Sequence, residues 1–300
     1  MDKPIIALIY DFDRTLSPRD MQEYGFIPGI GMEPEAFWSA CRSLALEHRM
    51  DGILAYMYMM QHMSQEAQKE LTRDTLRALG REIAFFPGVE TWFPRINAIG
   101  ESLGAKVEHY IISSGLQEII EGSRIGGFFR AVFAASFVYD KEGRPVWPAT
   151  AVNYTSKTQY LFRINKGILD ITNDSDLNAF TPEYKRRIPF SNMIYVGDGL
   201  TDVPCMKMTK LKGGYSIVVH APDSAALADD MLLQNRADFA LEADYSQGAA
   251  LETVVSELMR RIIADHALSR RHAEQMRRAH ARRGENSPFN IPVRGIAEED

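Results

Sequence analysis

Short apolar segments with strand character alternate along the chain with segments of helical periodicity. The strand-like segments cover residues 5–10, 107–112, 131–138, 193–196, 216–219 and 239–241. Strands that are apolar on both faces and separated by helices indicate a parallel sheet with helices on both sides. The pattern therefore predicts an α/β fold built from three layers.

Composition narrows the class of protein. The chain has 300 residues, of which 45% are hydrophobic and 25% charged, enough for a full core and an accessory domain. No apolar run reaches the length of about 18 residues that a membrane span requires, and the N-terminus lacks the features of a secretion signal, so we expect a soluble, cytoplasmic protein. The net charge of −6 makes a nucleic-acid partner unlikely. Cys41 and Cys205 lack metal-site spacing, which favours reduced thiols.

Polar residues follow three of the predicted strands directly. They are Asp11, Asp13 and Thr15 after the first strand, Ser113, Ser114 and Gly115 after the second, and Asp198 and Asp202 in "GDGLTD" after the fourth. In an open parallel sheet, ligands bind outside the carboxyl ends of the strands. Lys157, at a predicted helix start, can direct its ammonium toward the same edge. Each motif alone is common in turns, but the set predicts a functional site.

These four motifs, in this order over about residues 5–202, resemble those of the haloacid dehalogenase superfamily of phosphotransferases. The resemblance implies a Rossmann-like core and assigns Asp11 as nucleophile, Asp13 as general acid and base, and Lys157 as the residue that neutralises charge. It implies a Mg²⁺ ion held by Asp198 with support from Asp202, in a metal set that includes Asp11 and Asp13.

The same resemblance implies that Ser113 binds phosphate through its hydroxyl, although the adjacent Ser114 is an alternative. Thr15 and Gly115 complete the expected phosphate-binding group, with backbone amides near Gly115 holding phosphoryl oxygens.

The implied chemistry is also reasonable on physical grounds. A phosphate monoester is an anion, so a carboxylate can attack it only where cations neutralise both groups. Mg²⁺ prefers oxygen ligands, which carboxylates supply. An aspartyl phosphate on Asp11 splits one difficult displacement into two steps, and Asp13 would donate a proton and then accept one. Close acidic neighbours would raise the pKa of Asp13 above the usual value of about 3.9, as the first step requires.

Other interpretations of the motifs fit less well. Asp13 argues against a dehalogenase. A halide leaves without taking up a proton, so that reaction needs no acid at this position. A calcium loop would need glycine where Leu16 stands and glutamate where Gln22 stands. "GDGLTD" has Asp202 at the third glycine of a dinucleotide-binding turn, and "IISSG" lacks the first glycine of a nucleophile elbow.

The distance between the first two motifs predicts an inserted domain. One hundred residues separate Asp13 from Ser113, whereas a crossover between parallel strands needs about a dozen. Residues 35–79 have a helical pattern, and "FFPG" at 85–88 restarts the core. We predict a helical cap at residues 17–86, similar to that of phosphoserine phosphatases, on a core of residues 1–16 and 87–265. Such a cap would exclude water and select the leaving group.

Several segments keep two interpretations. Asp20 and Glu23 either contact a substrate amine, as an acid does in phosphoserine phosphatases, or stabilise a loop. Residues 167–192 form either an excursion near the site entrance or a packing element. Residues 266–300 form a basic helical tail that is solvated or contacts another subunit, with an anionic partner such as RNA as the weaker alternative, and its end is predicted to be disordered.

Together these features predict a magnesium-dependent hydrolase of a small-molecule phosphate monoester. A phosphotransferase that uses the same aspartyl phosphate, and a non-catalytic binding protein on the same fold, are the alternatives.

Overall fold

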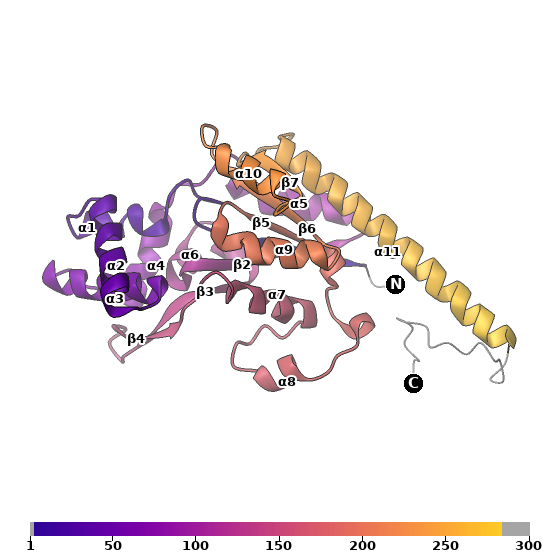
Figure 1. Cartoon of the computed structure of the whole chain (residues 1–300), viewed down its shortest axis with the longest axis horizontal. Helices are drawn as coiled ribbons and strands as arrows, with labels where there is room; N and C mark the ends of the chain where they lie inside the picture. Colours follow the sequence, from indigo (N-terminus) through magenta and orange to yellow (C-terminus); the bar gives the residue numbers. More distant parts are fainter. Residues whose placement is uncertain (1–2, 284–300) are drawn as a thin grey trace.

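The computed structural model describes residues 3–283 and contains a seven-stranded sheet in the order β4-β3-β2-β1-β5-β6-β7 (Figure 1). The strands are β1 (Ile5–Tyr10), β2 (Lys106–Leu116), β3 (Phe129–Tyr139), β4 (Pro145–Thr150), β5 (Met193–Gly197), β6 (Tyr215–His220) and β7 (Phe239–Glu242). All six predicted strands are present, and β1 pairs in parallel with both β2 and β5. The predicted α/β fold is confirmed.

The sheet departs from the predicted parallel arrangement at one edge. β4 pairs with β3 in the antiparallel direction, through a turn in which the Asp140 side chain accepts hydrogen bonds from the backbone amides of Glu142 and Arg144. The apolar pattern does not predict β4, because Pro145 and Pro148 lie within it. Proline cannot donate to a strand ladder, so it is confined mainly to edge strands and bulges, and β4 is such an edge.

Helices cover both faces of the sheet, so the core has three layers. One face packs against α5 (Val89–Leu103), α6 (Gln117–Gly122) and α11 (Ala250–Arg283), and the other against α7 (Lys157–Lys166), α9 (Val203–Leu211) and α10 (Ala226–Leu233). Alternate residues of β1 divide between two separate apolar clusters. Leu8 belongs to the cluster with Trp92 of α5, and Ile9 to the one with Met206 of α9. Period-2 alternation thus buries both faces of β1.

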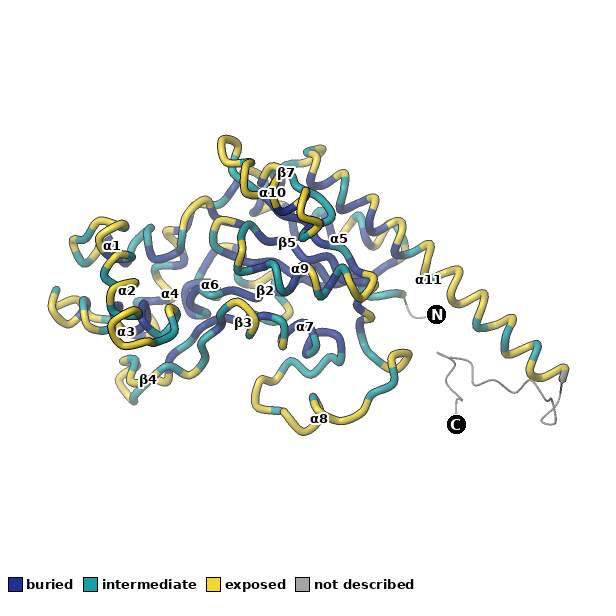
Figure 2. The backbone as a smooth tube through the Cα atoms, in the orientation of Figure 1, coloured by how far each residue is buried: buried dark blue, intermediate teal, exposed yellow. Residues whose placement is uncertain are grey.

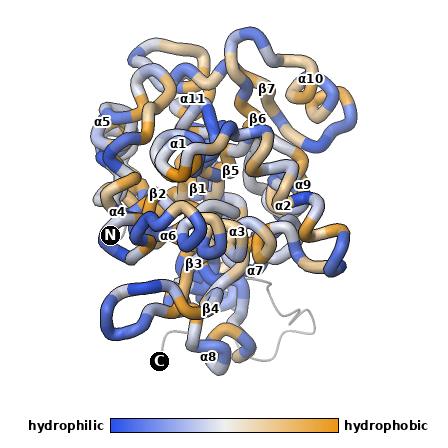
Figure 3. Tube along the Cα trace, turned by 90° about the vertical axis from the view of Figure 1, so that its left-hand side faces the viewer, coloured by the Kyte–Doolittle hydropathy of each residue, from blue (hydrophilic) through white to orange (hydrophobic). Residues whose placement is uncertain are grey.

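A group of helices lies between β1 and α5 in the chain. These are η1 (Met21–Glu23), α1 (Phe26–Gly29), α2 (Pro34–His48), α3 (Gly52–Glu66), α4 (Arg73–Leu79) and η2 (Gly80–Glu82). They lie to one side of the sheet in Figure 1, and Figure 3 views the molecule from that side. Gln61 of α3 donates to the Pro145 carbonyl of β4, and the Arg73 amide donates to the Gly143 carbonyl. These contacts join the helices to the β3–β4 hairpin.

Two segments extend outward from the core (Figures 1 and 2). The segment between α7 and β5 contains α8 (Asp174–Asn178), η4 (Glu183–Lys185) and η5 (Phe190–Asn192), and most of it is exposed. The last half of α11 projects beyond the body, and its described arginines are exposed, namely Arg270, Arg271, Arg277, Arg278 and Arg282. The two remaining short helices are η3 (Gly126–Phe128) and η6 (Leu200–Asp202). The predicted disorder after Gly284 lies outside the described residues. Within residues 3–283, none of the helices has the length and apolar character needed to span a membrane.

Candidate active site

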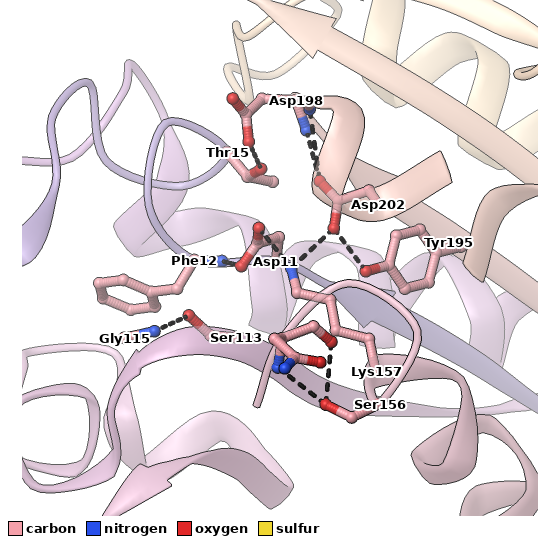
Figure 4. A network of polar contacts seen from close by, with 12 residues as sticks. Asp11, Phe12, Thr15, Ser113, Gly115, Ser156, Lys157, Tyr195, Asp198 and Asp202 are labelled. Atoms are coloured by element: carbon pink, nitrogen blue, oxygen red, sulfur yellow. Dashed lines mark hydrogen bonds and ion pairs between the residues drawn. The ribbon is translucent and has the colours of Figure 1, made fainter. Parts of the chain in front are cut away.

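A buried ion-pair network lies at the carboxyl ends of β1 and β5 (Figure 4). Asp11 follows β1, and its backbone amide donates to the Val196 carbonyl of β5, which fixes the carboxylate at the sheet edge. Lys157, the first residue of α7, places Nζ 2.7 Å from Asp11 Oδ2 and 2.8 Å from Asp202 Oδ1. The Lys157 side chain is fully buried, so its charge acts on both carboxylates with little screening by water.

Asp11 is held in one orientation with an elevated pKa. Its Oδ1 accepts a hydrogen bond from the Phe12 amide at 2.7 Å, and its Oδ2 faces Lys157. Burial raises the pKa of Asp11 to about 6, with a further contribution from the charge of Asp202, although Lys157 acts in the opposite direction. The same two carboxylates raise the pKa of Lys157 in spite of its burial, so the lysine remains an ammonium.

Asp202 is surrounded by hydrogen-bond donors. Its Oδ1 accepts from Lys157 and, at 2.7 Å, from the hydroxyl of Tyr195, while its Oδ2 accepts from the amides of Asp198 and Gly199 at 3.2 and 3.3 Å. A Cβ at Gly197 would lie 2.4 Å from this oxygen, so the close approach requires glycine. Asp202 therefore fixes both Lys157 and the loop that carries Asp198.

Three carboxylates at this edge can hold a metal ion. Asp11, Asp198 and Asp202 each offer an oxygen atom, and these atoms lie within 4.8 Å of one another. An all-oxygen donor set fits Mg²⁺, which usually takes one or two carboxylates and keeps waters. Asp198 is the least enclosed of the three, and it accepts a hydrogen bond from the hydroxyl of Thr15 at 3.2 Å. Burial, followed by the charges of Asp202 and Asp11, raises its pKa to about 8.

Asp13 lies outside this group of three, so its place in the metal set stays a prediction. Its Oδ1 accepts a hydrogen bond from the Met21 amide at 2.8 Å, and a Cβ at Gly115 would lie 2.9 Å from its Oδ2. Burial raises the pKa of Asp13 well above its ordinary value, helped by the charges of Asp20 and Asp11. This favours the protonated carboxyl that a proton donor needs.

The last residues of β2 bring Ser113 close to Asp11 (Figure 4) and Gly115 close to Asp13. Ser113 is buried, and its hydroxyl accepts from the Gly115 amide at 3.0 Å. Ser114 is half-buried, and its carbonyl accepts from the Tyr56 hydroxyl of α3 at 2.8 Å. Helix α6 begins two residues beyond Gly115, at Gln117. Both serines thus remain candidates for phosphate binding, and this end of β2 contacts α3.

Asp20 and Glu23 line a cleft of about 530 Å³ between the Asp13 loop and α2. Asp20 accepts from Arg14 Nε at 3.2 Å and Nη2 at 2.9 Å, while Glu23 accepts from Trp38 Nε1 at 3.0 Å. The charge of Asp20 raises the pKa of Asp13, so one acid of this cleft acts on the candidate proton donor.

Sequence reasoning missed three residues that line the same cleft, namely Arg14, Trp38 and Arg42. Arg14 lies between Asp13 and Thr15 of the first motif, and this position could have marked it as a candidate site residue. Trp38 and Arg42 carry no comparable signal, because their place in the cleft depends on how α2 packs.

Known proteins resemble this chain in sequence and in fold. A family model of haloacid dehalogenase-like hydrolases matches residues 8–207. An uncharacterized protein from Borreliella burgdorferi is 27% identical over 285 residues, covering 84% of this chain and 96% of the relative.

Solved structures show the same fold at low sequence identity. A HAD family hydrolase from Salmonella enterica serovar Typhi has a TM-score of 0.54 at 17% identity, covering 80% of this chain and 68% of its own. A probable phosphoserine phosphatase from Vibrio cholerae has a TM-score of 0.53 at 14% identity, with coverage of 88% and 67%. A substrate-bound phosphoserine phosphatase has a TM-score of 0.50 at 16% identity, with coverage of 85% and 99%. The family match spans every residue of the buried network, and the chain belongs to the haloacid dehalogenase-like hydrolase family.

Proposed function

We propose that this protein is a magnesium-dependent phosphatase that hydrolyses a small phosphate monoester through an aspartyl phosphate on Asp11. The observation that carries the proposal is the buried arrangement in which Lys157 bridges Asp11 and Asp202 beside Asp198. The solved phosphoserine phosphatases that share the fold support a small phosphate ester as the substrate.

In the first step, the Asp11 carboxylate attacks phosphorus and the bond to the leaving oxygen breaks. Lys157 offsets the negative charge that gathers between carboxylate and phosphate. Asp13, whose pKa is raised, donates its proton to the leaving alkoxide.

In the second step, Asp13 accepts a proton from water, and the resulting hydroxide displaces phosphate from Asp11. Asp11 and Asp198, held by Asp202, would bind Mg²⁺, which supplies a Lewis acid for the phosphoryl oxygens. Thr15, Ser113, Ser114 and Gly115 are the proposed phosphate-binding residues.

The helices of residues 17–86 are the proposed cap. The cleft lined by Asp20 and Glu23 is the proposed leaving-group site. Its acids are Asp20, Glu23 and Glu35, and its arginines are Arg14 and Arg42. A leaving group that carries an amine would pair with the acids. A cytoplasmic location stays a prediction.

The test is release of phosphate from a panel of small phosphomonoesters, including an activated aryl phosphate, with Mg²⁺ and then with excess chelator. We expect Mg²⁺-dependent release, and faster release from O-phosphoethanolamine than from ethyl phosphate, which lacks the amine. Equal rates on these two esters would remove the amine preference. If folded protein releases no phosphate from any ester of the panel, the proposed activity is contradicted. Transfer of phosphate to an added alcohol in preference to water would favour a phosphotransferase.

A further inference from the structure

A second cleft lies at the opposite edge of the sheet from Asp11. It has a volume of about 380 Å³, within the range of small-molecule sites. The ends of α7 and α9 form two walls, and Glu183, Arg186 and the chain just before β5 form the rest. The segment 167–192, whose purpose the sequence left open, therefore contributes one wall of a cleft.

The residues that line this cleft include one with a buried hydrogen-bond acceptor that has no partner among the described residues. The Asn165 side chain lines the cleft and is only 1% exposed. Its Nδ2 donates to the Ile188 carbonyl at 2.7 Å, but its Oδ1 accepts no hydrogen bond within the described part of the chain. Leaving a buried acceptor unpaired costs free energy, so a bound molecule that donates a hydrogen bond to it would be stabilised there.

Two cationic residues, Arg186 and Lys212, also line this cleft. Lys212, at the end of α9, holds Nζ 5.5 Å from the centroid of the Phe190 ring, which forms part of the cleft wall. Arg186 uses Nε for the Thr181 carbonyl at 3.3 Å, and its terminal nitrogens are donors of the kind that carboxylates accept. The cleft thus offers two positive groups for an anion and one acceptor for an N–H group.

We propose that this cleft binds a small zwitterion of amino-acid size. Its carboxylate pairs with Arg186 and Lys212, and its ammonium donates to Asn165 Oδ1. Glu183, also in the cleft wall, adds a negative charge that favours the ammonium.

The cleft is distant from the candidate active site but shares its elements. Lys157 begins α7, and Asn165 lies eight residues later, about 12 Å along the helix axis. Asp198 follows β5, and Ser191 of the cleft precedes it by about 20 Å of extended chain. Asp202 precedes α9, and Lys212 follows it. A zwitterion in this cleft is therefore separate from the substrate, and the inference does not rest on the proposed function.

Binding is tested on the full chain with the common L-amino acids as probes. Each is added at millimolar concentration in a thermal-shift assay, and any that raises the melting temperature is titrated by calorimetry. We expect at least one to bind, and both Lys212→Gln and Arg186→Gln to weaken it by about tenfold or more. The matched control is Lys207→Gln, an exposed lysine on α9 outside the cleft, which should bind normally. The variant Asp11→Asn should also bind normally, because the cleft is distant from Asp11.

The N,N,N-trimethyl derivative of the bound amino acid keeps both charges but has no N–H donor, so it should bind about tenfold more weakly. Four results would overturn the proposal: no probe binds, the cleft variants bind as well as wild type, Asp11→Asn loses binding, or the trimethyl derivative binds equally. Because binding is measured without turnover, its outcome is independent of whether the protein is a phosphatase.

Discussion

Buried carboxylates lie at both ends of the parallel strands, in opposite surroundings. Near the start of β2, Glu108 accepts from both terminal nitrogens of Arg187 at 2.6 and 2.7 Å, from the Tyr110 hydroxyl at 2.6 Å, and pairs with Lys106 at 2.9 Å. Burial would raise the pKa of Glu108, but the hydrogen bonds from Arg187, Tyr110 and Lys106 outweigh it and lower the pKa to about 2. Here several donors serve one acid.

At the other end, one cation serves several acids. Lys157 contacts Asp11 and Asp202, while Asp13 and Asp198 act on the same cluster through their charges. Burial first, and then the charges of neighbouring carboxylates, raise the pKa values of Asp11 and Asp198 to about 6 and about 8. Both clusters are buried, so burial alone does not distinguish a structural ion pair from a functional one. The imbalance of charge does, because it leaves room for a cation and then a phosphate.

The largest effect is expected from Asp11→Asn. An amide cannot form the phosphoryl bond, so turnover should fall by about a thousandfold or more. Phosphate release measures the loss, and circular dichroism should show an unchanged fold because asparagine keeps the shape and the acceptor for the Phe12 amide. Turnover at the wild-type rate would remove Asp11 from its assigned role.

A smaller and selective loss is expected from Asp13→Ala. A general acid contributes about 10²- to 10⁴-fold, and mainly where the leaving group is a poor one. Alkyl phosphates should therefore lose much more activity than an activated aryl phosphate, in rates measured side by side. Equal losses on both esters would argue against proton transfer by Asp13.

Near the start of β2, we expect Glu108→Gln to lower the free energy of unfolding by about 3 kcal/mol, because the substitution leaves Arg187 without its carboxylate partner. The lowered pKa gives the sign of the pH dependence. Glu108 contributes stability that is present above its unfolded pKa of about 4.5 and is lost as the pH falls toward 2. The difference between wild type and Glu108→Gln in chemical denaturation should therefore shrink between pH 5 and pH 3. A difference that stays constant with pH would exclude the ion pair as its cause.

An effect of opposite sign is expected from Asp198→Asn. Since the pKa of Asp198 is raised to about 8, metal-free wild type should lose stability as the pH rises from about 4 to 8, and the variant should not. At neutral pH without metal, Asp198→Asn should therefore unfold at or above the wild-type temperature.

Saturating Mg²⁺ should reverse that order by stabilising wild type by about 2 kcal/mol and the variant much less. The exposed Asp229→Asn variant is the control and should respond to Mg²⁺ like wild type. Equal stabilisation of all three proteins would contradict a metal site at Asp198.

Local pattern was sufficient for the main features of the fold. Apolar runs identified six strands, because a strand buried on both faces needs apolar residues at successive positions. Helical periodicity likewise predicted a helix that starts at Lys157. The pattern failed at β4, where Pro145 and Pro148 look like a loop, because only pairing with β3 makes that stretch a strand.

The sequence by itself determined that Asp11, Ser113 and Asp198 share one edge, since the carboxyl ends of neighbouring parallel strands meet there. Only the tertiary structure decided what surrounds them. The hydrogen bond from Tyr195 to Asp202, the pairing of Arg14 with Asp20, and the cleft floored by Asn165 have no signature in the chain. Each depends on distances between side chains whose positions are fixed by packing, and a one-dimensional pattern carries the period of an element but not those distances.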